Sequence, residues 1–330
     1  MSESRLRCAT PLFAAGIVFA VLLAGKLFAQ VPALTELNRG AAAATVAAPE
    51  TAKEAKSDAK FGSDWVRLQY DDNRQPLGLQ TAIVRYVPAQ VGGPRLPATS
   101  VDLVAAVHVG DAAYYAELNR RFDQYDAMLY ELVAPEGTVV PRGRGASSAH
   151  PLGALQNGMK SMLALEHQLE MIDYTKRNFV HADMSPDQFL QAMQDRNEGF
   201  VELFLRLLGQ SVAQQSKFAA DGDSPEIELF AALLSADRPR RLKMVLAKQL
   251  AETESLLVSF GGEEGSVLIT ERNKTALAVL KDQLAAGKKK LAIFYGAGHL
   301  ADMDRRLRQD FDMRPAEITW LTAWDLKPRP

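Results

Sequence analysis

The alternation and clustering of apolar residues predict strands in the first part of the chain. Residues 65–70 and 79–87 are rich in β-formers and flank the turn-rich segment DDNRQPLG, which predicts a hairpin or a pair of edge strands. VDLVAAVHVG (101–110) and AMLYELV (127–133) are nearly unbroken apolar runs. Runs of this kind are typical of strands that are buried on both faces of a sheet.

Helical spacing replaces this pattern in the middle of the chain. AAYYAELNRRFDQY follows the first buried strand, and Asp111 stands where it can cap that helix. Residues 155–260 are almost entirely helical by pattern, beginning with MKSMLALEHQLEMIDY. Further helices are expected at the SPD motif that begins at Ser185, over about 201–217 and over about 225–258.

The C-terminal part returns to strands. A helix is expected over about 270–286, and LAIFYGAGHLADM then predicts a strand, a Gly-rich turn and a helix. AEITWLTAW predicts a last strand. We therefore expect an α/β or α+β fold with a mixed central sheet, flanking helices and a large helical insert, about residues 155–260, between the two halves of the sheet.

The N-terminal residues have a different character. Residues 1–29 combine a short basic start with an apolar run and end in Ala29, which predicts a cleaved secretory signal or an uncleaved membrane anchor through residues 9–25. Residues 30–63 are Ala-rich and nearly lack large apolar side chains, as expected of a flexible linker. A single folded domain over residues 64–330 follows, and we expect it to be periplasmic or extracellular, either free or tethered to the membrane.

Charge and cysteine content narrow the function classes. A net charge of -2 offers no basic excess for binding phosphates, which argues against a nucleic-acid partner. The one cysteine, Cys8, lies in the N-terminal segment. The folded part therefore has neither disulfides nor thiolate ligands, and a metal site in it would use His, Asp, Glu, Asn and water.

Three polar residues stand out against the apolar strands. His108 and His299 follow buried strands, where open α/β sheets present catalytic groups, and Glu131 interrupts the apolar run AMLYELV. Together they could hold a divalent metal, or one histidine could take a proton from water while Glu131 orients it. Each also has a structural reading: a histidine that ends a strand, or a glutamate that pairs with Arg272.

The ordered motifs VAAVHVGD, LYELV, ITERN and FYGAGHLADM resemble the TraB/PrgY/GumN family, which includes the Tiki proteases. The second G-x-x-H element of that family is matched by residues 296–299, its Arg-Asn pair by Arg272 and Asn273, and its acidic position by Glu131. The first element departs from the pattern, because Ala105 stands where glycine is expected.

The resemblance implies a metalloprotease-like site. His108, Glu131 and His299 would bind a divalent metal (manganese, cobalt or zinc), and Arg272 would clamp a substrate carboxylate or stabilise an oxyanion. Four residues are candidate substrate contacts: Tyr115, His181, Asp183 and Asn273. Asn273 could instead orient a ligand or cap its helix.

The sequence thus predicts an exported metal-dependent hydrolase that acts on a small peptide or ester-type substrate. The alternative is a non-catalytic binding or regulatory protein of the same fold, which would sequester a peptide or a cofactor such as haem. The wider superfamily that the motifs resemble includes both erythromycin-esterase-like hydrolases and haem-binding ChaN-like proteins. The oligomeric state is left open.

Overall fold

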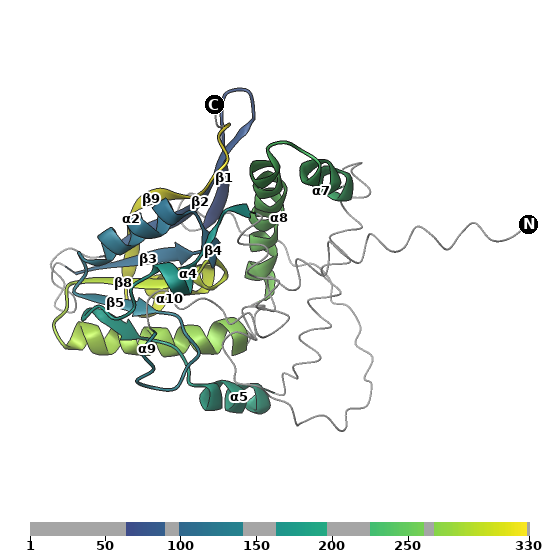
Figure 1. Ribbon diagram of the computed structural model, residues 1–330. Coiled ribbons are helices and arrows are strands. Elements are labelled where there is room, and N and C mark those ends of the chain that lie inside the picture. Colours follow the sequence, from purple (N-terminus) through teal and green to yellow (C-terminus); the bar gives the residue numbers. More distant parts are fainter. Residues whose placement is uncertain (1–63, 90–98, 141–162, 197–224, 261–266, 329–330) are drawn as a thin grey trace, which may run out of the picture.

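The computed structural model describes residues 64–89, 99–140, 163–196, 225–260 and 267–328 (Figure 1). The expected signal or anchor, the linker and the helix at about 201–217 lie outside these ranges. Within them, no helix is both long enough and apolar enough to cross a membrane.

A mixed seven-stranded sheet forms the centre of the molecule, as the sequence predicts. The strand order is β1-β2-β3-β8-β5-β7, and β9 also pairs with β2. The strands are β1 (Val66–Tyr70), β2 (Pro76–Pro88), β3 (Ser100–Ala106), β5 (Ala127–Tyr130), β7 (Phe179–His181), β8 (Lys290–Gly296) and β9 (Met313–Asp325).

The sheet has an antiparallel half and a parallel half. Strand β2 pairs antiparallel with β1, β3 and β9, whereas β3, β8, β5 and β7 run parallel to one another. Every residue of β5 is buried, and all of β8 except its first residue, as expected of parallel strands covered on both faces. Because parallel strands end at the same edge, the residues that follow β3, β5 and β8 gather there.

Helices lie along the sheet and beside its carboxyl edge (Figure 1). They are α2 (Ala112–Phe122), α4 (Gln168–Met171), α5 (Pro186–Asp195), α7 (Pro225–Leu233), α8 (Arg238–Phe260), α9 (Arg272–Ala285) and α10 (Leu300–Asp310). A π-helical turn η1 (Val267–Glu271) precedes α9, and a 3-10 turn η2 (Ala297–His299) joins β8 to α10. The main apolar cluster includes residues from Trp65 to Leu326, and a second, smaller cluster packs α5 against the turn η1.

Local sequence explains how α5 begins, whereas the cap expected for α2 has another role. Ser185 and Gln188 form a capping box in which each side chain accepts from the other's backbone N–H, and Pro186 follows at the first helical position of α5. Asp111 does stand at the N-cap of α2, but its carboxylate makes no capping bond. It accepts instead from Lys243 on α8, at 2.6 Å, and from the backbone N–H of Asp325.

The described part of the middle of the chain is less helical than predicted. MKSMLALEHQLEMIDY does not form one helix: in its described part, Leu163 is helical, β6 (Glu166–His167) pairs with β4 (Val109–Gly110), and α4 is a single turn. β7 also comes from this region and completes the parallel side of the sheet. The insert therefore contributes a sheet strand, so the two halves of the sheet are not separated by helices alone.

Two element boundaries also differ from expectation. The helix expected over about 225–258 is broken between α7 and α8, and Pro239 occupies the first turn after the break. Glu131 is not within β5 but immediately follows it. Its N–H still donates to the carbonyl of Phe294 on β8, at 3.2 Å, so the backbone remains held beside the sheet.

Candidate active site

A buried polar network lies at the carboxyl edge of the parallel strands. Glu131 follows β5, Arg272 opens α9, and His299 ends the turn after β8. Glu131 and His299 are 9% and 6% exposed, and Arg272 is 7% exposed. Burying charged groups to this extent is costly unless they are paired, so their partners decide what the site can do.

Arg272 is the centre of the network. It donates through Nε and Nη2 to the two carboxylate oxygens of Asp183, at 2.9 and 2.5 Å, and through Nη2 to Glu131 Oε1 at 2.8 Å. Burial alone would lower the pKa of Arg272, but the charges of Asp183 and Glu131 outweigh burial and raise the pKa above its ordinary value. Arg272 is therefore a permanent cation shared by two carboxylates.

Glu131 is held from two sides. Its second oxygen, Oε2, accepts the backbone N–H of Gly296 at 2.6 Å, while Oε1 lies 3.6 Å from His299 Nε2. Gly296 is the last residue of β8, so this bond fixes the carboxylate to the strand end that leads to His299. The carboxylate thus faces the imidazole with little freedom to move.

Asn273 sets the tautomer of His299. Its Nδ2 donates to the carbonyl of His299 and to Asp302 Oδ2, both at 2.9 Å, which leaves Oδ1 as the acceptor facing His299 Nδ1 at 2.8 Å. A neutral imidazole must then carry its proton on Nδ1 and its lone pair on Nε2. That lone pair faces Glu131 and the Nη1 of Arg272, the latter at 3.5 Å.

Tyr295 packs against the network. Its ring packs edge-on against His299, with centroids 5.2 Å apart, and its hydroxyl donates to the carbonyl of Ala182. Burial, followed by the charge of Asp183, raises the pKa of Tyr295 well above its ordinary value, so the hydroxyl remains a neutral donor. Tyr295 could not be predicted as a site residue, because a tyrosine in an apolar strand has the pattern of a core residue.

His108 occupies a neighbouring setting at the same edge. Its Nδ1 lies 3.2 Å from Gln168 Oε1, and its carbonyl accepts the N–H of Gln168 at 2.8 Å. Gln168 in turn donates to the hydroxyl of Tyr174 at 2.9 Å. The small β4–β6 sheet that follows His108 places Gln168 beside the imidazole. The contact between His108 and Gln168 could not be predicted, because a continuous helix was expected where β6 forms.

Four predicted substrate contacts have other partners. Tyr115 is fully buried and donates to the carbonyl of Val107, at 2.9 Å. Asp183 uses both carboxylate oxygens on Arg272, and Asn273, with no exposed surface, holds His299. His181 Nε2 donates to the carbonyl of Leu132 at 2.6 Å. In this arrangement Asp183 and Asn273 hold Arg272 and His299, and Tyr115 and His181 hold backbone carbonyls.

Arg272 is likewise not placed as a substrate clamp, because three of its N–H groups already serve Asp183 and Glu131. Nor do His108, Glu131 and His299 form a metal-holding group: within the described ranges, no three His, Cys, Asp or Glu side chains are arranged to hold an ion. The permanent cation beside Glu131 also opposes a second cation there. The residues as arranged therefore do not fit a three-ligand divalent metal.

The arrangement is suited to proton transfer. A base with a defined lone pair, His299 Nε2, lies between two charges: the fixed carboxylate of Glu131, 3.6 Å away, favours the imidazolium form, and Arg272 Nη1, 3.5 Å away, opposes it. Comparisons of the chain with protein-family models, with curated proteins and with solved structures find no match. The chemical interpretation therefore rests on the geometry of these residues.

Proposed function

We propose that this chain is an exported hydrolase of the TraB/Tiki type that cleaves a peptide, ester or amide bond of a small substrate, with His299 as the general base. The observation that carries the proposal is the hydrogen bond between Asn273 Oδ1 and His299 Nδ1, at 2.8 Å, because it leaves Nε2 as the proton acceptor. The motifs around Glu131, Arg272 and His299 that resemble the TraB family support the same reading.

The proposed reaction needs one proton acceptor and no covalent intermediate. Water attacks the substrate carbonyl carbon while its proton passes to His299 Nε2, and the C–N or C–O bond then breaks as the imidazolium returns the proton to the leaving group. Glu131 stabilises the imidazolium from 3.6 Å. Arg272 acts as a positioning residue, since it holds Glu131 rather than substrate.

A divalent metal remains a prediction of the family resemblance, and no step above depends on one. Metal content of the purified protein, compared with the His108→Ala and His299→Ala variants, tests it directly. If the protein contains stoichiometric manganese, cobalt or zinc and both variants lose it, Glu131 must bind the ion in place of Arg272. The metal-free reaction would then have to be abandoned.

A non-catalytic binding or regulatory protein is the second candidate. Its support is the closure of the network: Glu131, Asp183 and Arg272 satisfy one another and are nearly inaccessible. A protein that only sequesters a peptide or haem needs no accessible catalytic group, and such a closed network is compatible with that role. Retention of a correctly oriented base in the same network favours catalysis.

The deciding experiment is hydrolysis of a panel of short peptides, aryl amides and aryl esters by the full-length protein and its His299→Gln variant. We expect the variant to lose roughly 100-fold or more in kcat, the usual contribution of a positioned general base. A His150→Gln variant, to which the proposal gives no role, should retain full activity. Equal activity of wild-type and His299→Gln proteins, with both folded by circular dichroism, would remove His299 from the mechanism.

The pH dependence provides a second readout. The rate should fall on the acid side, because a protonated imidazole accepts no further proton. An Asn273→Ala variant releases Nδ1, so the wrong tautomer becomes populated and kcat should fall while KM changes little. A change confined to KM would mean that Asn273 acts on substrate binding instead.

A further inference from the structure

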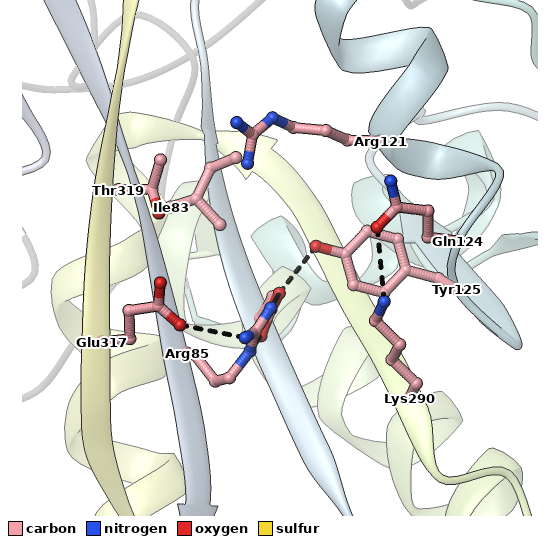
Figure 2. Close-up of a pocket in the computed structure, with 9 residues that line it drawn as sticks. Ile83, Arg85, Arg121, Gln124, Tyr125, Lys290, Glu317 and Thr319 are labelled. Atoms are coloured by element: carbon pink, nitrogen blue, oxygen red, sulfur yellow. Dashed lines mark hydrogen bonds and ion pairs between the residues drawn. The ribbon is translucent and has the colours of Figure 1, made fainter.

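A second site lies at the opposite edge of the sheet, where β8 begins and where the chain enters β5. A cavity of about 40 Å³ opens there (Figure 2). Nine residues line it: Ile83, Arg85, Asp102, Arg121, Gln124, Tyr125, Lys290, Glu317 and Thr319. None of them belongs to the network around Arg272, and the proposed hydrolysis leaves this cavity without a role.

One wall of the cavity is rigid because it is built on a buried carboxylate. Asp102, 1% exposed, accepts both Nε and Nη2 of Arg85 at 2.9 Å and the hydroxyl of Tyr125 at 2.7 Å. Arg85 Nη1 also donates to Glu317 at 3.0 Å. Both carboxylates thus accept from Arg85, and Asp102 also accepts from Tyr125, although the single charge of Arg85 balances only one of the two negative charges.

The other wall carries cations with unused donors. Arg121 donates its Nε–H to Glu117, at 2.7 Å, and Glu117 also accepts from Arg120. In Figure 2 the Arg121 side chain extends from its helix across the view towards the strands that carry Ile83 and Thr319. Lys290 Nζ lies over the Tyr125 ring, 5.4 Å from its centroid, and is only 3.5 Å from Gln124 Oε1, the outer limit of a hydrogen bond.

Charge and size together define the ligand class. Three cations and two carboxylates line the cavity, so the lining carries a net charge of +1, with Arg121 and Lys290 on the side away from the two carboxylates. A water molecule occupies roughly 10–15 Å³ on this measure, so the space takes only a few waters or one small anion. A nucleotide or a peptide would not fit within it.

We propose that Arg121 and Lys290 bind a small oxyanion of the size of inorganic phosphate in this cavity, with Arg85 and Tyr125 as its fixed wall. Two different kinds of donor would bind the anion. The planar guanidinium of Arg121 matches the spacing of phosphate and carboxylate oxygens, and the ammonium of Lys290 acts as a compact point charge. The site is a binding site, separate from the proposed catalytic edge, and it stands whether or not the protein is a hydrolase.

The test is calorimetric titration of the full-length protein with inorganic phosphate at low ionic strength. Chain geometry supplies matched controls: Arg120 pairs with the same glutamate as Arg121 but does not line the cavity, and Lys289 precedes Lys290 with its side chain outside it. We expect saturable one-site binding whose Kd rises about tenfold in Arg121→Gln and Lys290→Gln. Arg120→Gln and Lys289→Gln should stay within about twofold.

Each outcome decides the proposal. Absence of saturable binding overturns it, and so does equal weakening in the cavity variants and their controls, because that would be general surface charge. Acetate titrated in parallel distinguishes the two sources of oxyanion. Competition with phosphate at similar concentration would identify carboxylates as ligands of the site, whereas phosphate binding alone would restrict the site to tetrahedral anions.

Discussion

Arg272 joins side chains that are far apart in the sequence. Asp183 and Glu131 share its guanidinium, and its Nη1 reaches His299. A buried pair of this kind contributes little net stability, but removing one member leaves an uncompensated charge. The consequence is that each member of the network depends on the others for its place in the fold.

Arg272→Met should therefore lower the free energy of unfolding by about 3–5 kcal/mol, because Asp183 is left buried without its cation. Adding Asp183→Leu should recover part of that loss, since it removes the stranded charge. Urea unfolding of the single and double variants measures both effects. If the two losses simply add, the pair is not coupled as described.

At this scale the sequence indicated which polar residues lie near the carboxyl edge of the sheet better than it indicated their partners. Glu131 and His299 could be predicted to meet, because both follow parallel strands, and a pairing of Glu131 with Arg272 was one of the open readings. The partners of Asp183 and Tyr115 could not be predicted. In the sequence, a polar residue near a strand end looks the same whether its side chain faces a substrate or a buried arginine.

The first turns of α9 and α10 are tied together by side chains. Asp302, in the first turn of α10, accepts from Asn273, in the first turn of α9, and from Arg306 one turn further along. Burial would raise the pKa of Asp302, but these hydrogen bonds and the charges of Arg306 and Arg305 lower it below its ordinary value. The site histidine stands between the two helices that this contact fixes.

This lowered pKa gives a pH-dependent prediction. A carboxyl whose pKa is lower in the folded state contributes stability above the pKa of the unfolded chain, about 3.9, and loses it as the pH falls through the folded value. Asp302→Asn should therefore be less stable than wild type at pH 7, and the difference should shrink below about pH 4. Urea unfolding at a series of pH values would show this, and a constant difference would exclude the linkage.

Helices and strands with strong local signals were predicted, whereas those set by distant partners were not. The capping box at Ser185 marks the start of α5 in the sequence itself. The residues of β6 and β7 form strands because they pair with the edges of β4 and β5. The spacing of apolar residues over two or three positions does not distinguish a short strand from a turn of helix.

At the scale of the whole molecule, the α/β class followed from the apolar runs that became β3, β5 and β8. The folded unit was expected to begin near Trp65, and in the structure Trp65 has no exposed surface and its carbonyl accepts the N–H of Ala82. What the sequence could not reveal is the sheet order, because neighbouring strands are paired by tertiary contacts rather than by local pattern.

A chain that starts at residue 64 should accordingly fold with a thermal midpoint within a few degrees of the full-length protein. A chain that starts at residue 71 lacks β1 and the buried Trp65, and should lose about 3–5 kcal/mol, the cost of removing a large buried aromatic side chain. Calorimetry of both truncations would test this. Equal midpoints would show that β1 is dispensable.

The position of β8 between β3 and β5 has a consequence for biosynthesis. Residue 100 of β3 pairs with residue 290 of β8, and residue 127 of β5 pairs with residue 291 of β8. The strand in the middle of the parallel half, β8, is therefore the last of the parallel strands to leave the ribosome. Closing such long loops is slow, and until it happens β3 and β5 present open edges that invite aggregation. A nascent chain that stops before residue 290 therefore has two halves of a sheet and nothing to join them, which makes it a natural client of chaperones and proteases.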